Sequence, residues 1–126
     1  MAQANETDDS SIAIEESRLE NREDTLLLKL SGKLDLFAAD GLEQKLIHAA
    51  QHARHVIVDL SGVPYLSSSG LRVFIGLHKQ LEARAGSLRL AALQPPVEHV
   101  FRLAPMFALY PDVSAAMEAT DRGGAA

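Results

Sequence analysis

The side chains best placed for chemistry are three consecutive serines, Ser67, Ser68 and Ser69, which run into Gly70 and an apolar segment with helical spacing. A hydroxyl just before a helix can accept a hydrogen bond from a backbone N–H that the first turn leaves unpaired. Such capping needs one serine and can occupy a second. At least one hydroxyl is therefore left without a structural role.

A serine between a strand and a helix is also where some hydrolases carry their nucleophile. The nucleophile elbow has the pattern G-x-S-x-G, whereas the residue two positions before Ser69 is Ser67 and not glycine. The phosphate-binding pattern G-x-x-x-x-G-K-[ST] is absent from the sequence as well. We therefore expect no enzymatic activity from this chain alone, and no cofactor.

A group of histidines, His48, His52 and His55, has a spacing that could bring imidazoles together around a metal ion. The third histidine lies beyond the expected helix end, so its position depends on a turn that the sequence does not define. Histidines near a helix C-terminus are favoured by the helix dipole without any metal. We therefore expect no metal site.

The spacing of apolar residues predicts the elements that position these side chains. Segments 11–20 and 25–35 alternate apolar and polar residues, as strands do. Helical spacing predicts one helix from Ala38 to about His52 and another from Gly70 to Ala83, with Gly86 in the left-handed conformation after its end.

The rest of the chain continues this alternation of strands and helices. A β-branched run at 56–60 predicts a central strand covered on both faces. Segments 87–93 and 107–110 predict further strands, and 97–103 and the segment after Asp112 predict helices. Strands that are joined by helices lie parallel. We therefore expect an α/β domain with a mixed sheet of four or five strands and about four helices.

The composition suits a single domain. The chain has 126 residues, of which 47% are hydrophobic and 23% charged. Residues 1–11 are acidic and polar, and we expect them to form a flexible N-terminal tail. The domain is expected at 12–120, followed by a flexible C-terminal tail at 121–126. The sequence has no cysteine, which excludes a disulfide framework.

The charge pattern limits the choice of partner. The formal net charge is −5, and no cluster of Lys and Arg is present to bind nucleic acid or an anionic membrane. The first residues are acidic where a signal peptide would be basic and then apolar, and no apolar run has the length of a membrane span. We therefore expect a cytoplasmic protein whose partner is another protein.

Three segments carry a resemblance to a known family: "VIVDLSGVPYLSSSGLRVFIGLHKQL", "GKLD" at 32–35 and "FALYPDVSAAM" near the end. Together they resemble the STAS domain of bacterial anti-sigma factor antagonists, from about Ile12 to Ala119. The most specific part is "DLSGV" followed by "SSGL". The resemblance implies a compact sheet of four or five strands with helices, and a binding protein that is not an enzyme.

The resemblance also implies a phosphorylation switch at Ser69. In this family an anti-sigma factor that is also a serine kinase binds the unphosphorylated antagonist and phosphorylates the serine before the glycine, which releases the antagonist. A metal-dependent serine phosphatase reverses the modification. The sequence departs from the family pattern at Ser67, where relatives often have Asp, and at Arg72, where many have a small residue.

We expect the partner-binding surface around this serine. Asp35 would border it, or would simply form a turn or cap. Gly76 lies inside the second helix, where glycine costs roughly 1 kcal/mol relative to alanine, so either the close approach of a neighbouring backbone or partner, or tolerated slack in a well-buried helix, explains it. The expected partner-binding residues are Asp35, Ser67, Ser68, Ser69, Gly70, Arg72 and Gly76.

The physical case for a switch at Ser69 does not depend on the family. A phosphoserine adds roughly −1.5 to −2 charges, which the free N–H groups and dipole of a helix N-terminus accept. A protein docked over the same helix start would face a desolvated anion. The alternative is a STAS subunit of a transporter ATPase complex or a signalling scaffold that is never phosphorylated, in which the serines only cap the helix.

Overall fold

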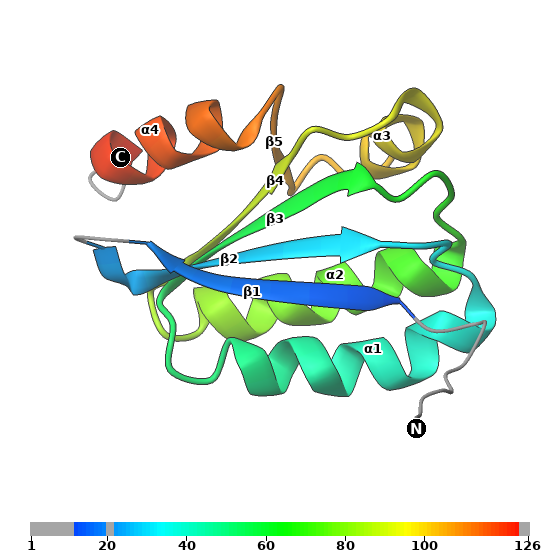
Figure 1. The fold of residues 1–126 in the computed structure, drawn as a ribbon, viewed down its shortest axis with the longest axis horizontal. Helices are drawn as coiled ribbons and strands as arrows, with labels where there is room; N and C mark the ends of the chain where they lie inside the picture. Colours follow the sequence, from blue (N-terminus) through cyan, green and yellow to red (C-terminus); the bar gives the residue numbers. More distant parts are fainter. Residues whose placement is uncertain (1–11, 20–21, 124–126) are drawn as a thin grey trace.

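The structure is a computed structural model that describes residues 12–19 and 22–123 and arranges them as five strands and four helices (Figure 1). The elements in chain order are β1 (Ala13–Leu19), β2 (Arg22–Ser31), α1 (Leu36–Ala49), β3 (His55–Gly62), α2 (Ser68–Glu82), β4 (Ser87–Ala91), α3 (Pro95–Phe101), β5 (Ala108–Tyr110) and α4 (Val113–Gly123). The predicted α/β class, with a mixed sheet of four or five strands and about four helices, is confirmed. The expected N-terminal tail, 1–11, lies outside the described residues.

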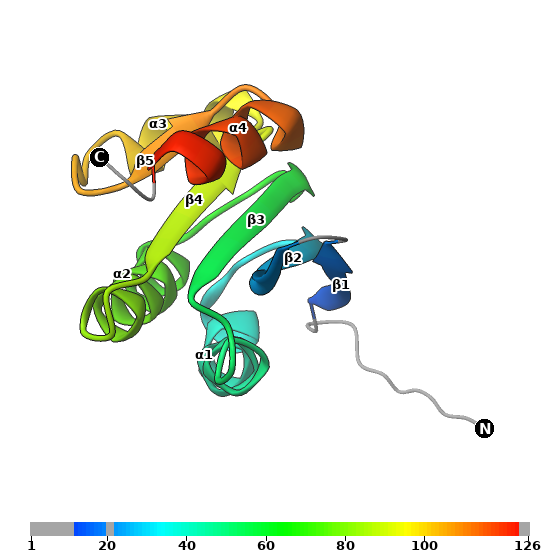
Figure 2. The same cartoon turned by 90° about the vertical axis from the view of Figure 1, so that its left-hand side faces the viewer.

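The five strands form one mixed sheet in the order β1-β2-β3-β4-β5. Strands β1 and β2 pair antiparallel, and every later pair is parallel. Helices α1 and α2 lie side by side on one face of the sheet, and α4 lies on the other, as the two perpendicular views show (Figures 1 and 2). The parallel strands end at the same edge of the sheet, so the segments that lead into α1 and α2 meet there.

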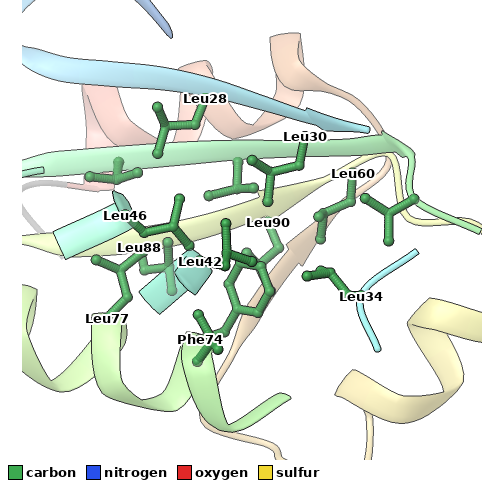
Figure 3. Packing of buried hydrophobic residues seen from close by; sticks show 14 of the residues in the cluster. Leu28, Leu30, Leu34, Leu42, Leu46, Leu60, Phe74, Leu77, Leu88 and Leu90 are labelled. Carbon is green, nitrogen blue, oxygen red and sulfur yellow. The ribbon is translucent and has the colours of Figure 1, made fainter. Parts of the chain in front are cut away.

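The main core lies between the sheet and α1, α2 and α3 (Figure 3). Alternating strand residues point into it, and the helices contribute one apolar stripe each. The strand members include Leu26, Leu28, Leu30, Val56, Val58, Leu60, Leu88 and Leu90, and the helix members include Leu42, Leu46, Phe74, Leu77, Leu81, Val97 and Phe101. The opposite face has a small second cluster, in which Ile57 and Ala91 pack against Ala116 of α4. Strand β3 is therefore covered on both faces, as predicted.

Several boundaries differ from the predicted ones. Helix α1 begins at Leu36, two residues before the predicted start at Ala38, because the Asp35 carboxylate accepts a hydrogen bond from Ala38 N at 3.0 Å and caps the first turn. Strand β2 begins at Arg22 and not at Thr25. Helix α4 continues to Gly123, so residues 121–123 are helical and only 124–126 of the expected C-terminal tail lie outside the described residues.

The end of α2 corrects the expectation for Gly86. The left-handed residue is Ala85, with a φ of 61°. Gly86 is required for another reason, because a Cβ there would lie 1.9 Å from the carbonyl oxygen of Arg54. This oxygen also accepts a hydrogen bond from Ser87 N at 3.0 Å. The glycine therefore allows the start of β4 to pair closely with the chain entering β3.

We predict that Gly86→Ala destabilises the domain, because the new methyl group must push the Arg54 backbone away; overpacking of this kind typically costs about 1–3 kcal/mol. Gly41→Ala is the matched control, since Gly41 is exposed in α1 and a Cβ there meets nothing within 4 Å. That variant should gain roughly 0.5–1 kcal/mol through helix propensity. Urea unfolding measures both, and equal stabilities of the two variants would contradict this account.

The sheet also contains a histidine with a perturbed pKa. Nδ1 of His55, at the start of β3, lies 2.7 Å from the hydroxyl oxygen of Ser87 on β4. Burial lowers the pKa of His55 below the ordinary value of 6.5, the charge of Asp24 opposes this, and the charges of Arg89 and Arg54 lower the pKa further. The folded protein therefore binds this proton more weakly than the unfolded chain does.

We predict that the free energy of unfolding falls as the pH drops from about 6.5 to the lower pKa that His55 has in the folded state. In this range the unfolded chain binds more protons than the folded protein does. Urea unfolding at pH 7.5 and pH 5.5 measures the loss. His55→Gln should reduce the difference between the two pH values, whereas His99→Gln, a change at an exposed histidine of α3, should retain it. An unchanged difference in His55→Gln would refute the assignment.

Candidate functional site

The site lies where the segment before α1 meets the segment before α2. Leu34 and Leu66 form an isolated parallel β-bridge. Leu34 N donates to the carbonyl oxygen of Tyr65, and the carbonyl oxygen of Leu34 accepts from Ser67 N, both at 2.9 Å. These bonds hold the N-termini of the two helices next to each other.

Ser67 is the N-cap of α2. Its hydroxyl oxygen accepts a hydrogen bond from Gly70 N at 3.1 Å, and the hydroxyl donates to the carbonyl oxygen of Leu34 at 2.9 Å. One of the three serines is therefore occupied by capping and by the link to the α1 segment. The sequence analysis noted Ser67 as a departure from the family pattern, and its hydroxyl oxygen makes the cap of α2.

The other two serines lie in the first turn of α2. Ser68 is exposed, and Ser69 is half-buried at the edge of a surface recess of about 420 Å³ between α1 and α2. The recess is lined by Leu36, Phe37, Ala39, Asp40, Glu43, Ser69, Arg72 and Val73. Ser69 is therefore a surface residue beside a hollow, and it lies outside the buried core.

Gly70, which we expected among the partner-binding residues, lies beneath the surface of the domain. It is buried, and a Cβ there would lie 2.7 Å from Cδ1 of Leu66 and 3.0 Å from the carbonyl oxygen of Leu34. A side chain would push the two helix starts apart. Gly70 therefore supports the site from beneath.

Gly76 has a close side-chain neighbour, whereas the expectation was the close approach of a neighbouring backbone or of a partner. A Cβ there would lie 2.8 Å from Oε2 of Glu43, which reaches across from α1. The glycine leaves room for this carboxylate, and Glu43 is one of the residues that line the recess. Asp35 is the N-cap of α1, where its carboxylate accepts a hydrogen bond from Ala38 N.

Two apolar residues of the site were missed by the sequence analysis. Leu36 is 64% exposed and Phe37 is 75% exposed, although both are large and apolar. They lie in the first turn of α1 and line the recess opposite Ser69. The sequence holds one indication of their exposure. Both residues directly follow the capping residue Asp35, and neither belongs to the buried apolar stripe of α1 that contains Leu42 and Leu46. Large apolar side chains left in water at one place are typical of an interaction surface.

The structure does not gather the three histidines of the sequence analysis around one point. His48 is in the last turn of α1, His52 follows that helix, and His55 is hydrogen-bonded in the sheet. Among residues 12–19 and 22–123, no group of three His, Cys, Asp or Glu side chains could hold a metal ion. None of the helices in this part of the chain has the length and apolar character to cross a membrane.

A mixed sheet, two helix starts tied to each other and a recess between them with exposed apolar residues on its rim define this small α/β domain. The family model of the STAS domain matches residues 16–116. The chain therefore belongs to the STAS domain family, and the resemblance seen in the sequence is confirmed.

Relatives of this chain include anti-sigma factor antagonists. It is 26% identical over 95 residues to the anti-sigma F factor antagonist of Paenibacillus polymyxa, covering 74% of this chain and 81% of the relative. It is 29% identical over 83 residues to the anti-sigma-B factor antagonist of Bacillus subtilis, covering 66% and 76% of the two chains.

The fold is shared with solved structures of the anti-sigma factor antagonist SpoIIAA. The unphosphorylated form has a TM-score of 0.70 at 25% identity, covering 88% of this chain and 97% of SpoIIAA. The phosphorylated form, from Bacillus, has a TM-score of 0.64 at 22% identity, covering 86% and 99%. At 22% identity, the likeness to the phosphorylated form shows a shared fold alone.

We predict that Ser67→Ala loses about 1 kcal/mol or more of stability, because it removes the cap of α2 and the bond to Leu34. Ser68→Ala changes an exposed serine of the same turn and should stay within about 0.5 kcal/mol of the parent. Ser67→Asp should keep the cap, since aspartate is an equally good N-cap residue, but it should lose the bond to Leu34, because an ionised carboxylate cannot donate a hydrogen bond. Thermal and urea unfolding measure all three, and equal losses at Ser67 and Ser68 would contradict the assigned cap.

Proposed function

We propose that this protein is an anti-sigma factor antagonist whose binding to an anti-sigma factor is switched off by phosphorylation of Ser69. The single observation that carries the proposal is the position of Ser69, half-buried at the N-terminus of α2 and at the edge of the recess. The relatives named as antagonists of anti-sigma factors support the choice of partner.

The proposed docking surface consists of the recess and its apolar rim. Leu36 and Phe37 supply apolar area that a partner can bury, at roughly 25 cal/mol per Å². Arg72 and the serines of α2 supply polar contacts on the opposite side. In this proposal Asp35, Gly70 and Gly76 act indirectly, because they position the two helices, and Ser69 is the residue that changes state.

A phosphate on Ser69 is compatible with the folded domain. The cap of α2 is made by Ser67, so modification of Ser69 leaves both hydrogen bonds of the Ser67 hydroxyl intact. The helix N-terminus favours the added negative charge. A partner that covers the recess would have to desolvate this charge, which costs several kcal/mol unless a cation pairs with it.

The proposal assigns two enzymes to the switch. The anti-sigma factor itself acts as the serine kinase, and a metal-dependent serine phosphatase restores the hydroxyl. The protein acts only by binding and works in the cytoplasm. The alternative, a STAS subunit of a transporter ATPase complex or of a scaffold, predicts that Ser69 is never modified, and the intact mass of protein purified from its native host distinguishes the two.

We predict that Ser69→Asp folds normally but binds the kinase partner about 100-fold more weakly or worse, because it buries a charge in the interface. Ser69→Asn has the same size without the charge and is the matched control, which should bind much more tightly than Ser69→Asp. Ser69→Ala should keep the affinity of the parent. Isothermal titration calorimetry measures all of them, and equal affinities of the Asp and Asn variants would refute the charge-based switch.

A further inference from the structure

The recess beside Ser69 contains charged groups that the proposed switch does not yet use. Asp40 and Glu43 line it from α1, and Arg72 lines it from α2. These three are the titratable side chains among the lining residues, the serine hydroxyl aside. Two carboxylates and one guanidinium therefore line the recess at whose edge Ser69 lies.

Arg72 is the basic group nearest to Ser69 on the same helix face. Residues three apart in a helix are neighbours, with Cβ atoms about 5–6 Å apart. Arg72 is exposed, so its side chain can turn toward Ser69 without leaving a packed position. A guanidinium can bind a phosphate through two parallel N–H···O hydrogen bonds.

The carboxylates lie on the other side of the recess. Glu43 reaches over Gly76, one helical turn beyond Arg72, where a Cβ would come within 2.8 Å of its Oε2 atom. Asp40 lies one turn before Glu43 on α1 and is exposed. The carboxylates of α1 would therefore repel a phosphate on Ser69, and the guanidinium of Arg72 on α2 would attract it.

We propose that Arg72 is the intramolecular partner of a phosphate on Ser69, and that Asp40 and Glu43 hold this phosphate on the α2 side of the recess. The proposal rests on the phosphorylation of Ser69 proposed above. Its consequence is that phosphorylation changes the recess in two ways. It adds charge, and it engages the one guanidinium that the recess would otherwise present to a partner.

The test is a titration of the phosphate by 31P NMR in protein that carries phosphoserine at position 69, installed during translation. Arg72→Gln should raise the second pKa of the phosphate by roughly 0.5–1 unit, because a cation beside the dianion is lost. Asp40→Asn combined with Glu43→Gln should lower it, because like charges are lost. The second pKa of the phosphate is measured directly, so no kinase or partner is needed.

Lys79→Gln is the matched control. Lys79 is exposed on the same helix, about 15 Å along the axis from Ser69, which exceeds the screening length of about 8–10 Å in physiological salt. Its removal should leave the phosphate pKa unchanged. A second readout is the Nε chemical shift of Arg72 in the parent protein, which should move on phosphorylation more than that of Arg102, the residue that follows α3.

An unchanged phosphate pKa in Arg72→Gln, or an equal change in Lys79→Gln, would overturn the role of Arg72. A double Asp40–Glu43 variant whose phosphate pKa stays the same or rises would overturn the role of the carboxylates. These results are independent of partner binding. If the titrations behave as expected but phosphoserine at position 69 leaves the affinity for the kinase partner intact, the proposed function fails instead.

Discussion

The carbonyl oxygen of Leu34 is the point on which the site depends. It accepts hydrogen bonds from both the backbone N–H and the hydroxyl of Ser67, each at 2.9 Å. These bonds join the segment entering α1 to the segment entering α2, although the two residues are 33 positions apart in the chain. Together with the bond from Leu34 N to the carbonyl oxygen of Tyr65, they hold the two helix starts side by side at the edge of the recess.

The link is effective because the helices are also fixed at their other ends and along their length. Arg84 follows α2 and donates to the carbonyl oxygens of Ala50 at 2.6 Å and Gln51 at 3.2 Å, which satisfies acceptors left at the end of α1. Between the two ends, Leu46 and Leu77 belong to one buried core. The helices thus behave as one packed layer, and a change of charge on its surface can alter binding without moving the helices apart.

The sequence was sufficient for features that depend on local pattern and insufficient for those that depend on distant contacts. The alternation of Leu26, Leu28 and Leu30 predicted β2 because a strand with one buried face must alternate. The start of α1 was predicted two residues late, because Leu36 and Phe37 do not follow the buried stripe and the periodicity therefore does not include them. Their exposure beside Ser69 required knowledge of how α2 lies against α1.

The glycines show the same limit. Gly86 could be recognised as a helix end and Gly76 as an anomaly inside a helix, but their surroundings come from residues far along the chain. Backbone atoms of Leu34 lie close to Gly70 and those of Arg54 close to Gly86, while the carboxylate of Glu43 lies over Gly76. The spacing of residues along the sequence does not predict these contacts between distant parts of the chain.

The three serines divide two requirements that would conflict in a single residue. If Ser69 were the cap of α2, a phosphate on its hydroxyl would disrupt the helix start, and the loss of the cap alone would cost about 1 kcal/mol. Ser67 makes the cap and the bond to Leu34. Ser68 lies between Ser67 and Ser69, so Ser69 falls within the first turn of α2. There it retains the favourable field of the helix N-terminus and lies at the edge of the recess. The position allows the electrostatic state of the surface to change while the hydrogen bonds that build the surface stay in place.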